Sequence, residues 1–337
     1  MENNFTEQEI RPKDLLAGQQ KALKHDINFL ESHSSEFVDV NCPACDSNNF
    51  IKKYEKYGFN IVECKFCETD YTNPRPSSDL LGLFYSQSAN YAYWNKYIFP
   101  ASEAVRREKI FKKRVNSILE YCDKFNASSN SILEVGAGFG TFCEELKSRN
   151  IFKKIVAVEP TPSLAETCRK KGIETIQKPI EKILISDDEK FDVVVNFEVI
   201  EHLFSPKEFI QQCKRFLKPG GLFVVTCPNG QGFDVVTLKE ISNTVDHEHL
   251  NYFNPKSLGL LLQNCGFEIL ESLTPGVLDA DIVRNAVLDG KYSLANQGFL
   301  KQILIDDWDT KGVDFQNFLI DNKLSSNMWI IARSNIK

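Results

Sequence analysis

The sequence contains no run of apolar residues near the length of about 18 that a membrane-spanning helix needs. Its first residues, MENNFTEQEIRPKD, are polar and acidic, without the apolar core of a secretory signal peptide. Excess positive charge is also missing, since 40 basic and 46 acidic residues give a formal charge of −6. We therefore expect a cytoplasmic protein with no membrane segment and no broad basic face for nucleic acid.

The chain is not expected to be disordered. Hydrophobic residues make up 42% and charged residues 26% of its 337 residues, which is typical of globular proteins. This length supports two domains, or one domain with a sizeable extension. Residues 1–40 are polar and predict an N-terminal arm with one helix near 14–31.

Ten cysteines are many for such a chain, and four of them form two C-x2-C pairs 18 residues apart. Without a signal peptide, disulfides are disfavoured, because the cytosol keeps thiols reduced. The other six are expected to be small buried core residues. The paired cysteines are Cys42, Cys45, Cys64 and Cys67.

Residues 41–72 therefore predict a compact metal module. Each C-x2-C turn directs two thiolates at one centre, and two such turns complete the closed tetrahedral shell that structural Zn2+ prefers. The stretch between them reads as a β-hairpin over 50–54 and 59–62. Iron in a rubredoxin-like site fits the same ligands, and a free-thiol or redox cluster is the remaining alternative. A closed shell has no open position, so a structural role is expected.

Residues 73–129 form a connector that is rich in aromatic residues and then in basic ones. Core packing explains the aromatic residues most simply, and the alternative is a lid in which Tyr91 or Tyr93 reaches the reacting group. The basic run over 106–114 is expected to be a solvated helix face, or else to meet the phosphates of a nucleotide-linked substrate.

Residues 130–337 alternate strand and helix patterns. Near-continuous apolar strands between amphipathic helices indicate an α/β fold with a parallel sheet covered on both faces. Such sheets bind ligands at the carboxyl ends of their strands. Two or three helical stretches are expected in an insertion at about 279–322. The expected strands are 132–135, 155–159, 173–176, 191–197, 222–226, 267–272 and 328–332, and the expected helices are 141–149, 162–171, 206–217 and 255–265.

A glycine-rich turn follows the first of these strands. Gly136, Gly138 and Gly140 are spaced G-x-G-x-G, which departs from the dinucleotide spacing G-x-G-x-x-G. Glu159 ends the second strand 19 residues later, where a carboxylate can accept both hydroxyls of a ribose. The pair suits an adenosyl ligand. A phosphate-binding G-x4-GK-[ST] sequence is absent, which argues against a nucleotide hydrolase.

Taken in order, the motifs of 130–270 resemble those of class I S-adenosylmethionine-dependent methyltransferases. The resemblance implies a Rossmann-like seven-stranded sheet with helices on both faces and an antiparallel last strand. A small zinc-ribbon-like β module precedes this domain. The motifs are EVGAGFG at 134–140, VEP at 158–160, FDVVVNFEVIEH at 191–202 and LKPGG at 217–221.

The resemblance also implies a set of S-adenosylmethionine contacts. Glu134, Gly136, Ala137, Gly138, Phe139 and Gly140 would line the methionine end, and Glu159 with Pro160 would bind the ribose. Ile180 and Glu181 would flank the adenine, while Asn196, Phe197, Glu198 and His202 would lie beneath the methionyl part. Many members have an acidic residue where Lys178-Pro179 stands here, so the contact to the adenine amino group differs.

Methyl transfer often needs a base, and the segment 246–253 offers two histidines after the fifth strand. We expect His249 or His247 to be this base, with Tyr93 as a further catalytic candidate. A histidine that only anchors the loop is the alternative. In a few family members an E-x-x-E-H run binds a divalent ion, so Glu198, Glu201 and His202 are a second possible metal site.

The four-cysteine module ahead of this domain is similar to the layout of sugar C-methyltransferases and of methyltransferases in surface-polysaccharide gene clusters. Those enzymes usually carry a longer second domain after the cofactor domain. The resemblance implies a small-molecule acceptor, namely a sugar or sugar nucleotide. The alternatives are an RNA or protein methyltransferase that docks through the ribbon, and a non-catalytic cofactor-binding scaffold. Carbon, oxygen and nitrogen acceptors all fit this fold.

Overall fold

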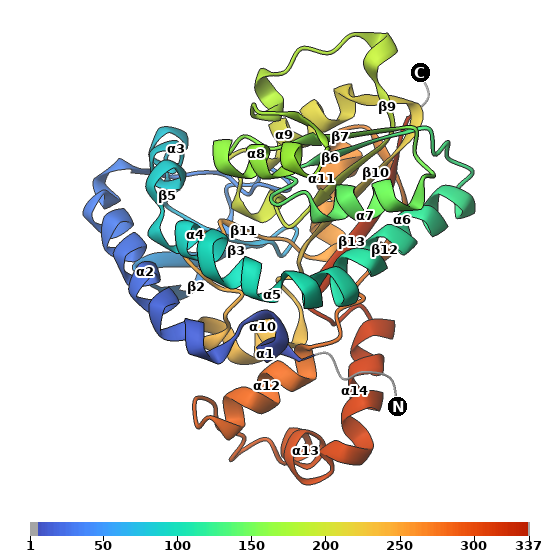
Figure 1. Cartoon of the computed structure of the whole chain (residues 1–337). Helices are drawn as coiled ribbons and strands as arrows, with labels where there is room; N and C mark the ends of the chain where they lie inside the picture. The colour runs from blue at the N-terminus through green and yellow to red at the C-terminus, as the bar shows by residue number, and fades with distance from the viewer. Residues whose placement is uncertain (1–5, 336–337) are drawn as a thin grey trace. The chain divides into compact units, whose positions relative to one another are not determined.

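The computed structural model describes residues 6–335. It contains a seven-stranded sheet in the order β12-β13-β10-β9-β6-β7-β8 (Figure 1). The pairs β10–β9, β9–β6, β6–β7 and β7–β8 are all parallel. The strands are β6 (Ser131–Val135), β7 (Lys154–Val158), β8 (Glu174–Ile176), β9 (Phe191–Phe197), β10 (Leu217–Pro228), β12 (Phe267–Leu273) and β13 (Asn327–Ser334).

Burial explains the apolar composition of these strands. Every residue of β6 and β9 is buried, as expected for parallel strands that are covered on both faces. Five helices pack around the sheet, and α8 and α9 begin with proline in the first turn, where no backbone donor is lost. These helices are α6 (Lys112–Lys124), α7 (Thr141–Arg149), α8 (Pro162–Lys170), α9 (Pro206–Arg215) and α11 (Pro255–Asn264). The predicted fold class is confirmed.

One predicted boundary is wrong. The helix expected over 206–217 ends at Arg215, and β10 begins at Leu217 with an irregular register before Leu222. The glycine pair Gly220-Gly221 explains the irregularity, because Gly220 has a φ of +76° and a Cβ on Gly221 would lie 2.9 Å from the carbonyl of Asp192.

The chain divides into two compact units. One comprises Met1–Glu103, Pro228–Ser257 and Leu273–Met328, and the other comprises Ala104–Cys227, Leu258–Ser272 and Trp329–Lys337. The second unit holds most of the seven-stranded sheet. The segment expected as a helical insertion at 279–322 belongs to the first unit.

The first unit contains a four-stranded sheet in the order β11-β4-β3-β2. Its hairpin turns at Tyr57-Gly58, which have φ values of +52° and +74°, the handedness that two-residue hairpins favour. This confirms the predicted hairpin. The strands are β2 (Phe50–Lys56), β3 (Phe59–Cys64), β4 (Asp70–Thr72) and β11 (Asn251–Tyr252), and a separate pair joins β1 (Phe37–Val38) to β5 (Arg75–Pro76).

Helices make up the rest of the first unit. The predicted N-terminal helix is α2, and the aromatic connector is helical, with Ser77 capping α3 and Ser88 capping α4. The α- and π-helices up to residue 106 are α1 (Glu7–Ile10), α2 (Lys13–Ser32), α3 (Ser78–Gln87), α4 (Ala89–Tyr93), the π-helix η2 (Trp94–Ile98) and α5 (Phe99–Arg106), whose last residues belong to the other unit. The π-helix η3 (Arg107–Phe111) follows in that other unit.

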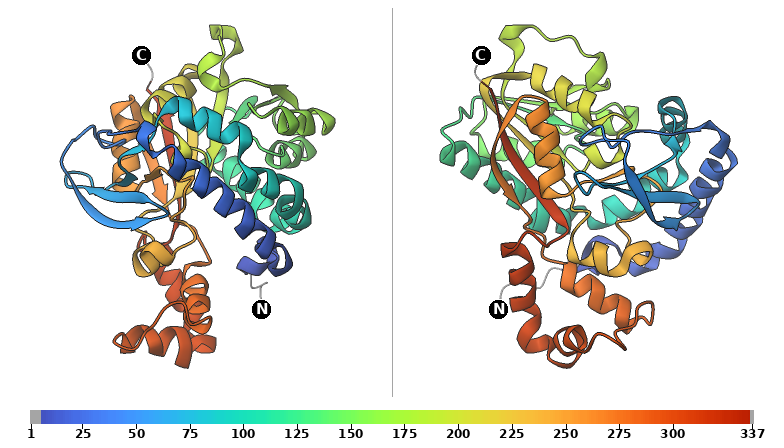
Figure 2. Two further views of the ribbon diagram at one scale, coloured as in Figure 1. Left: turned by 90° about the vertical axis from the view of Figure 1, so that its left-hand side faces the viewer. Right: turned by 180° about the vertical axis from the view of Figure 1, so that it is seen from behind.

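The C-terminal helices lie together in both views of Figure 2. Their side chains share a small core of their own. Val283 and Leu304 are fully buried in it, and Leu238 contributes from α10. The helices are α10 (Phe233–Leu238), α12 (Asp279–Leu288), α13 (Gly298–Lys301), the π-helix η8 (Gln302–Asp306) and α14 (Trp308–Asp321). In the part of the chain described, no helix is both long and apolar enough to cross a membrane.

Candidate functional site

The glycine loop leaves β6 in a conformation that side chains tolerate poorly. Gly136, Gly138 and Gly140 have φ values of +81°, +55° and +68°. A Cβ on Gly136 would lie 2.5 Å from Cγ2 of Val199, whereas a Cβ on Gly138 would meet nothing within 4 Å. The loop therefore packs closely at its first glycine and leaves open space at its second. Such open space beside backbone amides suits a ligand that approaches the main chain.

Glu159 connects β7 to this loop. Its carboxylate accepts the backbone N–H of Gly138 at 2.8 Å and that of Thr161 at 2.8 Å. Burial raises the pKa of Glu159, and these two hydrogen bonds oppose that rise. Each carboxylate oxygen keeps acceptor capacity beyond one bond, so the group can also accept hydroxyls. Its place, bonded to the glycine loop, fits the expected ribose contact.

Glu134 lies beneath the loop on β6 and is buried. Burial raises its pKa to about 8, although a hydrogen bond from the Cys143 thiol at 3.0 Å and the charge of Arg114 act in the opposite direction. The group is therefore mostly protonated at neutral pH. A neutral carboxylic acid can both donate and accept a hydrogen bond.

The end of β9 presents the next expected cofactor contacts. Asn196 is fully buried, donates through Nδ2 to the carbonyl of Val135 at 2.8 Å, and has no partner at Oδ1 among the described residues. Phe197 lies under the guanidinium of Arg114, whose Cζ is 4.6 Å from the ring centroid. An unpaired acceptor buried beside the glycine loop fits a polar ligand there.

Glu198 has a φ of +55° and accepts a hydrogen bond from Thr226 Oγ1 at 2.5 Å. Its carboxylate is also 3.5 Å from the guanidinium of Arg114. Glu201 is buried, and Nε2 of His202 is 3.9 Å from its Oε1. Glu198 thus already faces a cation, which disfavours a divalent ion at the same carboxylate.

The remaining expected contacts lie at the loop and the sheet edge. Ala137 is buried between the glycines, and Phe139 is half-buried. Pro160 is exposed directly after Glu159. Ile180 is buried at the start of the 3₁₀ turn η4 (Ile180–Lys182), with Glu181 exposed.

Several side chains of the basic run 106–114, within the connector, pair with acidic groups. Arg107 forms two ion pairs, to Glu144 at 2.6 Å and to Glu145 at 2.7 Å. Lys112 pairs with Glu108 one helical turn away. These contacts fit the expected helix face better than a phosphate site.

The four paired cysteines come together at the base of the β2–β3 hairpin. The Sγ atoms of Cys42 and Cys67 are 3.4 Å apart, and those of Cys45 and Cys64 are 3.5 Å apart. All four lie within 4.8 Å of one another. Zn–S bonds of about 2.3 Å in a tetrahedron require sulfur atoms roughly 3.8 Å apart, so the set fits zinc.

The thiols differ in acidity: the hydrogen bond with Cys67 and burial raise the pKa of Cys42, and burial raises the pKa of Cys45 to about 12. A hydrogen bond from Cys42, aided by Thr69 Oγ1 at 3.1 Å from the sulfur, lowers the pKa of Cys67 to about 5. The six other cysteines are buried and unbonded to one another, as expected.

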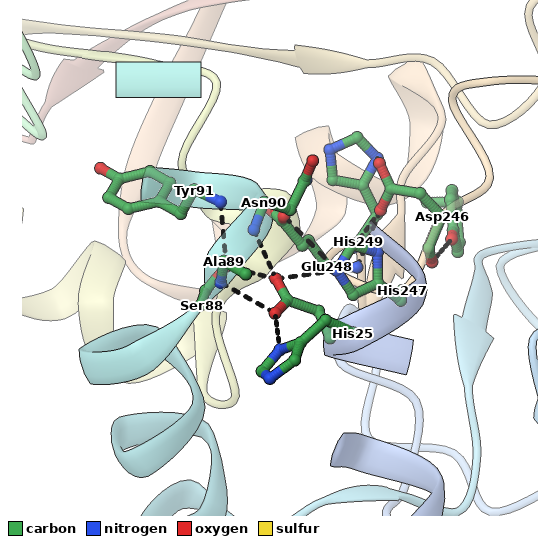
Figure 3. Close-up of polar contacts among 11 residues, drawn as sticks. His25, Ser88, Ala89, Asn90, Tyr91, Asp246, His247, Glu248 and His249 are labelled. Atoms are coloured by element: carbon green, nitrogen blue, oxygen red, sulfur yellow. Dashed lines mark hydrogen bonds and ion pairs between the residues drawn. The ribbon is translucent and has the colours of Figure 1, made fainter. Parts of the chain in front are cut away.

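The histidine segment, residues 244–254, belongs to the first unit together with α2 and α4. Figure 3 shows its residues 246–249 beside Ser88–Tyr91. His247 is buried, with Nε2 3.5 Å from Glu248 and 3.9 Å from Asp26. Burial alone would lower the pKa of His247, but Asp26 and Glu248 raise it above its ordinary value. His247 is thus a buried imidazole whose Nε2 lies near the carboxyl groups of Asp26 and Glu248.

His249 is half-buried and differently placed. Its Nδ1 lies 2.7 Å from the carbonyl of Thr244, which fixes the proton on Nδ1 and leaves Nε2 as the basic nitrogen. The amide of His249 donates to Asp246 at 2.8 Å. Tyr93, from α4, donates its hydroxyl to the carbonyl of Leu15 at 3.1 Å and so connects α4 with α2.

Sequence reasoning missed Asp26. Its carboxylate accepts hydrogen bonds from Ser88 Oγ at 2.6 Å, from the amide of Ala89 at 2.8 Å and from the amide of Asn90 at 2.9 Å. Burial would raise its pKa, but His247 and these donors lower it. No local pattern links residue 26 to 247, and only an aspartate on the apolar face of α2 could have drawn attention to it.

Comparison with known families identifies the part of the chain around the glycine loop. A family model described as a methyltransferase domain matches residues 105–272. This part of the chain is a methyltransferase domain. The match includes β6 through β12 almost entirely, and with them both Glu159 and the glycine loop.

Curated relatives match parts of this methyltransferase domain. A protein of Mycolicibacterium smegmatis named a probable S-adenosylmethionine-dependent methyltransferase is 39% identical over 87 residues, 26% of this chain and 32% of that protein. The human mitochondrial ubiquinone biosynthesis O-methyltransferase is 30% identical over 154 residues, 41% of each chain. The chain thus spans less than half the length of these relatives.

Among solved structures, a S-adenosylmethionine-dependent methyltransferase from Clostridium acetobutylicum is similar, with a TM-score of 0.47 and 12% identity over 72% of this chain and 99% of that one. Because this similarity is low, the fold assignment depends instead on the strand order of the sheet and on the family match.

Proposed function

We propose that the protein transfers a methyl group from S-adenosylmethionine to a small-molecule acceptor. The observation that carries this proposal is the hydrogen bond between Glu159 and the Gly138 amide within the methyltransferase domain. This bond supports the proposal because it brings the carboxylate expected to bind the ribose next to the loop expected to line the cofactor. Asn196 Oδ1, buried without a partner among the described residues, would accept from the methionyl ammonium.

For the base we propose His249 rather than His247. The carbonyl of Thr244 holds the Nδ1 proton of His249, so its Nε2 can accept a proton from the acceptor. His247 is buried and already faces two carboxylates, a setting that stabilises a charge rather than exchanging protons with a substrate. Tyr93 remains a further candidate for contact with the acceptor.

For the four-cysteine site we propose structural Zn2+ held by Cys42, Cys45, Cys64 and Cys67. A Zn2+ ion bound by four cysteines would take no part in methyl transfer, because its closed ligand shell leaves no coordination position open. The ten cysteines without disulfides support a reducing location such as the cytoplasm.

As acceptor we propose a sugar or sugar nucleotide of cell-surface glycan synthesis. The support is the layout of a four-cysteine module ahead of the methyltransferase domain, together with a net charge of −6 that disfavours RNA. A second candidate is a phenolic hydroxyl, because some matching relatives are named ubiquinone biosynthesis O-methyltransferases.

The test begins with calorimetric titration of the full chain with S-adenosylmethionine, S-adenosylhomocysteine and NAD. We expect saturable binding of the first two and none of NAD. Methyl transfer from labelled S-adenosylmethionine is then measured on sugar nucleotides, on polyhydroxylated phenols and on RNA. Turnover on sugar nucleotides supports the proposal, turnover on phenols alone replaces the acceptor, and a strict requirement for RNA overturns it. Cofactor binding without turnover on any acceptor favours a scaffold.

A further inference from the structure

The four-cysteine module and the histidine segment are far apart in sequence but form one continuous structure. The hydrogen bond from Asn254 to the carbonyl of Cys67, for example, joins residues 187 positions apart. Strand β11, inside the histidine segment, pairs antiparallel with β4, in the register Asn251 with Tyr71 and Tyr252 with Asp70. The amide of Thr72 extends this pairing by donating to the carbonyl of Leu250 at 3.0 Å. The segment is therefore the edge strand of the module's own sheet.

Asn254 ties the end of the segment to the metal ligands. It is buried, and its Nδ2 donates to the carbonyls of Cys67 at 3.2 Å and Glu68 at 3.0 Å. Glu68 has a φ of +59°, as the second C-x2-C turn reverses direction there. The same asparagine exchanges hydrogen bonds with Ser257 at the start of α11, at 2.8 and 3.0 Å.

Arg75 ties the middle of the segment to the module. Its guanidinium is buried and donates to Asn251 Oδ1 at 3.1 Å and to the carbonyl of Leu250 at 3.4 Å. Its Nε donates to the carbonyl of Thr72 at 3.1 Å, and its Cζ lies 5.8 Å from the centre of the Tyr71 ring. One side chain therefore joins β4 and β11 at the residue next to His249.

We infer that the four-cysteine module is the scaffold that positions the histidine segment, with Asn254 and Arg75 as the positioning residues. Cys64 and Cys67, together with Cys42 and Cys45, would hold a metal ion that fixes the second C-x2-C turn. The carbonyls of this turn accept from Asn254, and β4 pairs with β11. Loss of the metal would release the segment that carries Glu248 and His249. That this segment serves catalysis depends on the proposed function, whereas its coupling to the module does not.

The experiment uses the full chain loaded with Zn2+ and reads two quantities that do not depend on turnover. The first is the rate at which a chromogenic chelator removes the metal. The second is amide hydrogen exchange in residues 249–254, with β9 as an internal reference. Asn254→Ser keeps an oxygen that can cap α11 but loses both donors to the turn. Arg75→Lys is the second variant, and Lys256→Ala, an exposed side chain 4.0 Å from Glu68, is the matched control.

We expect Asn254→Ser to release the metal about tenfold faster than the wild type. Removing groups that hold metal ligands in place typically weakens metal binding by this factor or more. Exchange in 249–254 should rise in both variants and after metal removal, while exchange in β9 stays constant. Lys256→Ala should behave like the wild type. The inference is overturned if the chain binds no metal. It is also overturned if amide exchange in residues 249–254 changes neither after metal removal nor in Asn254→Ser. Cofactor binding and turnover in the same samples report separately on the proposed function.

Discussion

The carboxylate of Glu159 accepts the backbone N–H of Gly138 at 2.8 Å, so the end of β7 holds the loop that follows β6. The two residues follow the carboxyl ends of neighbouring parallel strands, β6 and β7, which meet at one sheet edge. A carboxylate in this place restrains the loop before any ligand arrives. The affinity for the cofactor should therefore depend on Glu159 in two ways: the carboxylate restrains the glycine loop, and it is expected to bind the ribose.

Replacing Glu159 by Gln should weaken S-adenosylmethionine binding about 10- to 100-fold. The amide nitrogen of Gln cannot accept from a backbone N–H, so one of the bonds to Gly138 and Thr161 is lost, and charge-assisted hydrogen bonds are worth about 1.5–3 kcal/mol. Calorimetric titration measures the effect. The control is Glu174→Gln, on the exposed start of β8, which should bind like the wild type. Equal affinities for both variants would contradict the ribose assignment.

Gly136→Ala should destabilise the fold and lower cofactor affinity. The φ of +81° is strained for alanine, and the new methyl group would lie 2.5 Å from Val199. We expect a loss of about 1–3 kcal/mol in the free energy of unfolding. Gly82→Ala is the matched control, because in α3 a Cβ meets nothing within 4 Å, and there we expect a gain of about 0.5–1 kcal/mol. Urea denaturation followed by circular dichroism compares the two variants, and similar changes would refute the packing argument.

Cys64→Ser should abolish tight metal binding by the full chain. Tetrahedral zinc sites of this type need four deprotonated ligands, and serine is a poor substitute for a thiolate. Elemental analysis of the wild type should find about one zinc or iron ion per chain and the variant should hold almost none. Cys265→Ser, at a buried cysteine far from the module in sequence, should keep its metal. If both variants keep their metal, the four thiols do not form the site.

His247 should make stability depend on pH. Burial lowers its pKa, but Asp26 and Glu248 raise it, with Asp246 also contributing, so the net folded-state value lies above the ordinary value of 6.5. A raised folded pKa stabilises the protein fully below about pH 6.5, and this contribution is lost as the pH rises through the folded-state pKa. Urea unfolding between pH 5.5 and 9 should therefore show falling stability.

In His247→Gln this decline should be reduced, and at pH 6 the variant should be about 3 kcal/mol less stable, because two buried carboxylates lose their cation. His33→Gln, on a half-buried histidine at the end of α2, is the control. A wild-type stability that rises across this range, or an unchanged slope in His247→Gln, would exclude His247 as the buried cation.

The sequence by itself determined the elements that depend on local pattern. The mostly apolar run 191–197 predicts a strand buried on both faces, and Gly136, Gly138 and Gly140 predict a turn that needs positive φ. The two C-x2-C pairs specify a four-thiolate centre, because two residues between cysteines bring both sulfurs to one side of a tight turn. Each of these features follows from residues that are close together in the sequence, so it could be predicted without the tertiary structure.

Only the tertiary structure decided what these elements contact. Asp26 and His247 face each other across 221 positions, which is the difference between their numbers, and burial makes their charges interdependent. Asn254 reaches the carbonyls of Cys67 and Glu68 because β11 pairs with β4. This pairing cannot be predicted from the sequence, because β11 is only two residues long. Hydrogen bonds between distant segments are fixed by the packing of the whole unit, and no local spacing encodes them.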